Sequence, residues 1–134
     1  MKRSEFENSS KPTLMDMLEA MLPIAMSVLK IDVLPTIKLL KDVQDENQPT
    51  FGQYVQSENI VFLAINNRHP NDVLRSLAHE LTHFKQDIND ELDHTSGSTG
   101  SDAENEANST AGIIMRQLNS KYPKFLLADP INLP

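Results

Sequence analysis

Residues 72–88 read DVLRSLAHELTHFKQDI, and their apolar spacing predicts a helix of about five turns. His79 and His83 lie four residues apart in this run. On a helix, residues at that spacing lie one above the other, so both imidazoles can bind the same metal ion. Taking about 100° per residue, the apolar residues fall on the arc opposite the two histidines. A pair packed into the core would share the apolar arc, which leaves a metal site or a solvated pair as the alternatives.

The composition of the 134-residue chain indicates one globular domain. We expect residues 1–11, which are polar and without periodicity, to be disordered and residues 12–134 to form that domain. The chain has no cysteine, which excludes disulfides and thiolate metal sites. Its net charge of -7 disfavours nucleic acid as a partner. We find no membrane-spanning run and no signal peptide, and therefore expect a cytoplasmic protein without a membrane partner.

The first half of the chain predicts a helix, an edge strand and a loop. Apolar residues, several of them methionines, recur at helical spacing over residues 13–29, and Pro23 is expected to bend this helix. Its Met-rich stripe fits a core position better than a partner-binding surface. Residues 33–40 contain Pro35 and suit an edge strand. The acidic residues 42–48 are expected to form a loop.

Downstream, a hairpin precedes the long helix and another helix follows it. Residues 51–56 and 60–66 are predicted as strands joined by the polar turn 57–59. After the long helix, residues 89–100 are polar and predict a flexible connection, and residues 101–120 predict the last helix. No periodic pattern organises the C-terminal tail. The predicted fold class is therefore α+β, with a small sheet of about three strands.

A mononuclear zinc site needs a third protein ligand, and Glu104 is the leading candidate. Glu104 shares a face of the last helix with Ala107 and Ala111, whose small side chains would let the two helices approach closely. Glu106 points about 200° away. The alternative is a capping box, in which Glu104 would reach back to the backbone of Ser101 and bind no metal.

Two further arrangements of ligands are alternatives to this site. A metzincin site would need a histidine six residues after His83 and a glycine three residues after it. Those positions hold Asn89 and Gln86, so this class is rejected. His94 is an alternative ligand, a hydrogen-bond donor to the reacting group, or an ordinary surface histidine.

The run from His79 to His83, followed by Glu104-Asn105-Glu106-Ala107-Asn108, resembles the gluzincin arrangement. The downstream part is similar to ImmA/IrrE-type peptidases, and residues 77–86 with 104–116 are similar to small metallopeptidases of tailed bacteriophages. The resemblance implies Zn²⁺ held by His79, His83 and Glu104, with Glu80 as the catalytic base. It also implies a minimal zincin-like fold whose edge strand can pair with an extended peptide.

We therefore expect a zinc-dependent metallopeptidase that acts on a peptide or protein substrate, in the host cytoplasm if the source is a phage. Tyr54, His94 and Tyr122 are candidates to donate a hydrogen bond to the developing oxyanion. Asn108 is a candidate to orient a metal ligand. The alternative function is a non-catalytic, zinc-stabilised interaction protein that binds a phage or host protein. Glu80 favours the enzyme, because a purely structural site would not need it.

Overall fold

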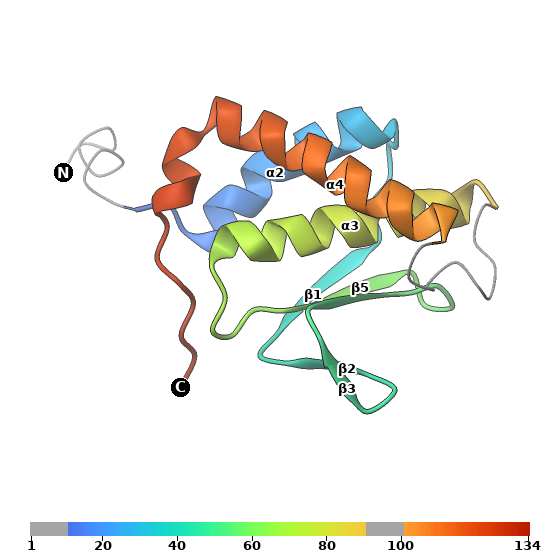
Figure 1. Ribbon diagram of the computed structural model, residues 1–134, viewed down its shortest axis with the longest axis horizontal. Helices are drawn as coiled ribbons and strands as arrows, with labels where there is room; N and C mark the ends of the chain where they lie inside the picture. The colour runs from blue at the N-terminus through green and yellow to red at the C-terminus, as the bar shows by residue number, and fades with distance from the viewer. Residues whose placement is uncertain (1–10, 91–100) are drawn as a thin grey trace.

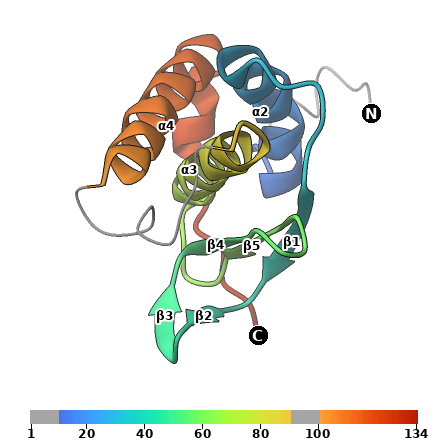
Figure 2. The same ribbon diagram turned by 90° about the vertical axis from the view of Figure 1, so that its right-hand side faces the viewer.

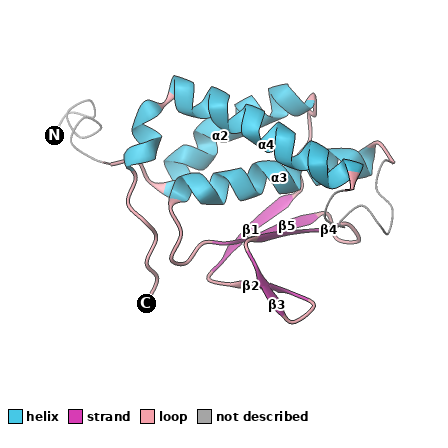
Figure 3. Cartoon of the chain, in the orientation of Figure 1, coloured by secondary structure: helices cyan, strands magenta, loops and turns pink. Residues whose placement is uncertain are grey.

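The computed structural model of the chain describes residues 11–90 and 101–134. Within these ranges it is an α+β protein with three α-helices, a three-stranded sheet and a separate two-stranded sheet (Figure 3). The expectation of disorder falls almost wholly on residues 1–10, outside the described residues. Lys11 is described and forms an exposed ion pair with Asp129 at 2.8 Å.

Helix α3, Pro70–Ile88, carries the two histidines and lies between the three-stranded sheet and the other two helices (Figures 1 and 2). It begins two residues earlier than the prediction from residue 72. His69 caps the helix, because its Nδ1 accepts the backbone N–H of Asn71 at 3.0 Å, and proline suits the first helical turn. Most of the predicted apolar stripe is buried, namely Leu74, Leu77, Ala78, Leu81 and Phe84. Its last member, Ile88, is 48% exposed, because it lies at the end of the helix.

Helices α2, Leu14–Leu29, and α4, Asp102–Lys121, cover the side of α3 that faces away from the sheet (Figure 2). Helix α2 starts with a reciprocal capping box between Thr13 and Asp16, and Pro23 lies inside it. Its methionine stripe belongs to the core, as predicted: the buried residues of α2 are Met17, Leu18, Met21, Ala25 and Leu29.

The three-stranded sheet has the order β1-β5-β4. The central strand β5, Ile60–Ala64, pairs in parallel with β1, Thr36–Leu40, and antiparallel with β4, Gly52–Val55. The predicted hairpin and the predicted edge strand are both confirmed, although β1 begins only after Pro35. The apolar run of β5 follows from its central position, since α3 covers one face of this strand.

The expectation of a loop over residues 42–48 is wrong. Strands β2, Val43–Asp45, and β3, Gln48–Thr50, form a short antiparallel hairpin. Glu46 and Asn47 make the two-residue turn with φ of 52° and 65°, as turns that join tightly paired strands require. The strands are too short and too polar to show an alternating pattern, which explains the error.

The C-terminal tail is ordered by tertiary contacts. A 3-10 helix, η1, spans Pro123–Leu127, and the chain then returns to the sheet side of the molecule. Ile131 forms an antiparallel bridge with Arg68, with backbone hydrogen bonds of 2.7 and 2.8 Å to Asn67 and Arg68. No helix among the described residues is long and apolar enough to cross a membrane.

Candidate metal centre

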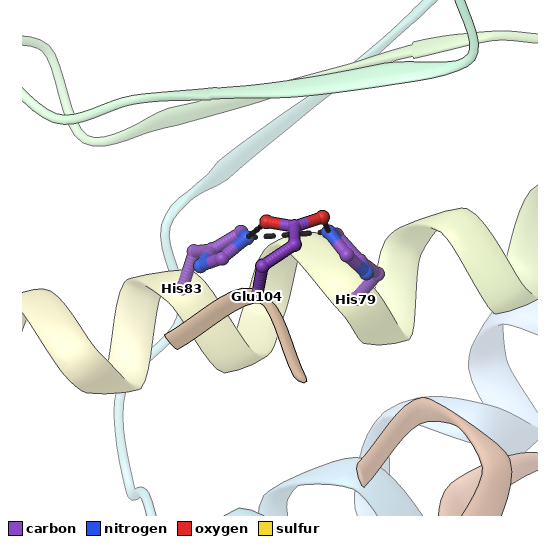
Figure 4. A group of neighbouring side chains, drawn as sticks. All are labelled: His79, His83 and Glu104. Atoms are coloured by element: carbon purple, nitrogen blue, oxygen red, sulfur yellow. Dashed lines mark hydrogen bonds and ion pairs between the residues drawn. The ribbon is translucent and has the colours of Figure 1, made fainter. Parts of the chain in front are cut away.

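His79, His83 and Glu104 come together where α3 meets the first turn of α4 (Figure 4). The Nε2 atoms of the two histidines are 3.2 Å apart. The Glu104 carboxylate spans them, with Oε1 2.9 Å from His79 Nε2 and Oε2 3.0 Å from His83 Nε2. We refer to these three residues as the triad.

The three side chains of the triad are close enough to hold one metal ion. Zinc binds histidine nitrogen at about 2.0–2.1 Å and carboxylate oxygen at about 2.0–2.2 Å, so two ligands of a tetrahedral ion lie about 3.3 Å apart. The two histidine Nε2 atoms, 3.2 Å apart, match this separation, and each of them has a different oxygen of Glu104 within 3.0 Å. Two nitrogens with one carboxylate are donors that zinc accepts.

Gln86 fixes the orientation of His83. Its side-chain oxygen lies 2.8 Å from His83 Nδ1. Its nitrogen donates to the carbonyl of Ala103 at 3.0 Å and to the carboxylate of Glu106 at 2.8 Å. Because both amide hydrogens are used, the oxygen must accept, so His83 Nδ1 carries the hydrogen that it donates to Gln86. In neutral His83 the Nε2 lone pair therefore points at the triad centre.

In this tautomer, His83 directs an electron pair toward the other two residues of the triad. His83 Nε2 faces Glu104 Oε2 at 3.0 Å, and the lone pairs of these two atoms repel each other unless a cation lies between them. Burial lowers the pKa of His79 below its usual value, and the neighbouring His83 lowers it further; Glu104 and Asn108 only partly oppose this. The lowered pKa favours neutral His79, the form in which an imidazole can bind a metal ion.

Glu104 combines the two roles that sequence reasoning set against each other. Ser101 is the N-cap of α4, and its hydroxyl accepts the backbone N–H of Glu104 at 3.1 Å. The Glu104 side chain contacts His79 and His83. The backbone of Glu104 therefore serves the cap while its carboxylate completes the triad.

Glu80 lies beside the triad, between α3 and strand β4. Burial raises the pKa of its carboxyl group from 4.5 to about 7; the charge of Glu104 adds to the rise, while His83 and a hydrogen bond from the backbone N–H of Tyr54 oppose it. The strand comes this close because residue 52 is glycine: a Cβ there would lie 3.4 Å from Glu80 Cγ and 3.2 Å from Leu63 Cδ2.

Comparisons with protein-family models, with curated proteins and with solved structures found no match to this chain.

A cleft of about 410 Å³ opens beside the triad. Its lining residues come from the β3–β4 segment, from α3 and from α4. The lining residues are Thr50, Phe51, Gly52, Arg75, Ser76, His79, Glu80, Asn108 and Ala111. Glu80 and His79 thus face a space that an external molecule can enter.

The structure places the other predicted site residues as follows. Asn108 hydrogen-bonds His79, in line with an orienting role. The hydroxyl of Tyr54 is 2.5 Å from Asp87 and 3.0 Å from Asn59, so it would have to leave Asp87 to reach a substrate. Tyr122 caps the far end of α4, about 27 Å along the helix from Glu104, and this distance excludes direct contact with a group held at the triad.

His94, the remaining candidate donor and alternative ligand, lies outside the described residues. Gln86 was not predicted to be a functional residue. It served only to exclude a metzincin site, which has a glycine at that position. The available signal was its spacing: a residue three positions after His83 lies on the neighbouring turn of the same face. The contact of Glu106 with Gln86 was also not predicted, because that contact depends on how α4 packs on α3.

Proposed function

We propose that this protein is a zinc-dependent metallopeptidase with a zincin-like fold, in which His79, His83 and Glu104 hold Zn²⁺ and Glu80 is the general base. The observation that carries the proposal is the convergence of three electron-pair donors, with the tautomer of His83 set by Gln86. A neighbouring buried carboxylate on the rim of a cleft is the second requirement of hydrolysis.

Bound zinc would polarise the scissile carbonyl and lower the pKa of a water molecule. Glu80, whose carboxyl pKa is raised by burial in the metal-free protein, lies beside the triad and can take a proton from the attacking water. The water oxygen bonds to the carbonyl carbon, the carbon–nitrogen bond breaks, and Glu80 passes the proton to the departing amine. The products are a carboxylic acid and an amine, so the atoms of peptide and water balance.

The surroundings of Glu80 also suit an extended peptide. Strand β4 is an outer strand of the three-stranded sheet, and Gly52 at its start lines the cleft. An outer strand has backbone N–H and C=O groups on one side that can pair with a peptide. A peptide aligned with β4 would cross the cleft above Glu80 and next to His79.

Two variants of neighbouring glutamates test the ligand assignment. Glu104→Ala removes a proposed ligand and should strongly reduce the zinc that purified protein retains, measured by elemental analysis. Glu106→Ala removes a carboxylate of the same turn that contacts Gln86 but not the triad, and should reduce zinc content much less. The reverse order would overturn the choice of ligand.

Glu80→Gln tests the base. The variant should retain zinc and lose cleavage of a peptide library that the parent digests, and a chelator should abolish parental cleavage. Cleavage at the parental rate by fully zinc-loaded Glu80→Gln would overturn the assignment. Zinc binding without cleavage by the parent would instead support the non-catalytic interaction protein.

A further inference from the structure

Two arginines, Arg75 and Arg116, line a second hollow, which shares Arg75 with the cleft beside the triad. Arg75 precedes His79 by one turn of α3 and lines both the cleft and this hollow. The hollow has a volume of about 390 Å³ and is lined by Arg75, Gly112, Met115, Arg116, Asn119 and Ser120. The guanidinium group of Arg116 lies beside Gly112, with Nη1 3.4 Å from the position that a Cβ of residue 112 would take.

The cleft and the hollow both lie against α3 and α4, and we refer to the two together as the groove. Helices α3 and α4 run in opposite directions, as the colour ramp of Figure 1 shows. Glu104 therefore meets His83 at one end, and Asn119 meets Asn71 near the other. The two asparagine side chains donate to each other at 3.0 and 3.3 Å and so link the helices beyond the arginines.

Neither Arg75 nor Arg116 has an ion-pair or hydrogen-bond partner within residues 11–90 and 101–134, and both are exposed. Arg68 is the contrasting case. It is buried, donates to three backbone carbonyls and to Ser76, and stacks 4.4 Å from the centre of the Phe51 ring. Arg68 therefore links the sheet to α3, whereas the two groove arginines have their donors available for a ligand.

The charges around Arg75 and Arg116 favour a single carboxylate as the ligand. The chain has a net charge of -7, and the same cleft holds Glu80, so a polyanion such as a nucleic acid would be repelled. A single carboxylate next to two guanidinium groups is favourable, because arginine donates paired hydrogen bonds to it. Arg75 and His79 are about 6 Å apart along the helix, which an extended peptide spans with about two residues.

We propose that Arg75 and Arg116 form a subsite for a substrate carboxylate about two residues from the cleaved bond. The carboxylate is either an Asp or Glu side chain or the C-terminus of a peptide. This inference rests on the proposed peptidase function and names its substrate class: acidic peptides, or peptides cleaved near their C-terminal end.

The cleavage test uses zinc-loaded protein and peptides that differ in one carboxylate. One series moves a Glu or a Gln through the three positions on each side of the cleaved bond, and a second compares free with amidated C-termini. The parent should prefer the carboxylate at one position by about tenfold in kcat/KM, mainly through KM. The series that shows the preference identifies the source of the carboxylate.

Arg75→Gln and Arg116→Gln should each reduce that preference several-fold, and the double variant should no longer distinguish the paired peptides. Arg75→Lys should restore it only in part, because lysine keeps the charge but not the paired donors. Lys38→Gln is the matched control, since it removes one exposed positive charge on β1, at the opposite edge of the sheet. Equal cleavage of all paired peptides by the parent, or an undiminished preference in the double variant, would overturn the subsite.

A binding measurement separates this inference from the proposed function. Fluorescence anisotropy of the same labelled peptides is recorded with Glu80→Gln protein, alone and combined with Arg75→Gln. Tighter binding of the carboxylate peptide that depends on Arg75 supports the subsite even if the parent cleaves nothing, in which case only the peptidase proposal fails. Identical binding of both peptides rejects the subsite whatever the parent cleaves.

Discussion

Replacing Glu80 by Gln has a consequence for folding stability that is independent of catalysis. In the protein without metal, burial raises the pKa of Glu80 from 4.5 to about 7. A tenfold change in proton affinity corresponds to about 1.4 kcal/mol, so ionised Glu80 disfavours the folded state by about 3 kcal/mol. The glutamine side chain has nearly the same shape and an oxygen that can accept the Tyr54 N–H, but it carries no charge.

The sign of the pH dependence follows from proton binding. Between pH 4.5 and 7 the folded protein keeps a proton on Glu80 that the unfolded chain has lost. Raising the pH through this window therefore lowers the free energy of unfolding of the parent. Glu80→Gln has no such proton, so the variant should gain up to about 3 kcal/mol relative to the parent between pH 4 and pH 8.

The assay is urea unfolding followed by circular dichroism, on parent and variant stripped of metal, at several pH values across the window. Glu58→Gln, in the exposed β4–β5 turn, controls for the change in net charge. Because only the difference between parent and variant is used, ionisations common to both proteins largely cancel. A difference that stays constant from pH 4 to pH 8 would show that Glu80 is not buried against α3 and β4 as described.

Three other variants test the surroundings of the triad. Gln86→Leu removes the oxygen that accepts the hydrogen bond of His83 and should weaken zinc affinity about 10–100-fold in a chelator competition. Gln117→Leu, at an exposed position of α4, is the control and should leave the affinity unchanged. Equal affinities of the two variants would refute an orienting role of Gln86. The pKa of Tyr54 is raised above 10 by burial, and then by the hydrogen bond and the charge of Asp87. The parent should therefore lose stability as the pH rises past 10, and Tyr54→Phe should lose less. Parallel alkaline unfolding curves of the two proteins would contradict this. Ala107→Leu overfills a fully buried site on α4, so it should lower the free energy of unfolding in urea by about 1–3 kcal/mol and should also lower the zinc affinity. An unchanged stability would refute close packing there.

Features that depend on a few neighbouring residues, such as those of α3, could be predicted from the sequence. The spacing of His79 and His83, and the apolar arc opposite them, follow from the geometry of a single helix, and the structure agrees with both. The β4–β5 hairpin and the N-cap at Ser101 were also predictable, since turn and cap preferences act over a few neighbouring residues. The hairpin over residues 43–50 was not, because its strands are short and polar.

Glu104 marks the limit of sequence reasoning. Its wheel position allowed both a cap and a ligand, and the antiparallel packing of α4 on α3 turned its carboxylate toward the histidines. The same packing joins Gln86 to Glu106 and places Arg116 in the groove with Arg75. No sequence spacing encodes these pairs, since their partners are separated by 20 residues or more along the chain.

The sequence by itself determined which side chains α3 presents together, because 3.6 residues per turn places every fourth residue on one face. Only the tertiary structure decided what those side chains meet. Burial of apolar surface on α2, α3 and α4 sets how the helices cross, and that packing positions the third ligand, the orienting glutamine and the unpaired arginines. Hydrophobic attraction has no preferred direction and acts between residues far apart in the chain. The sequence pattern of each helix therefore does not specify which residues of different helices meet at the site.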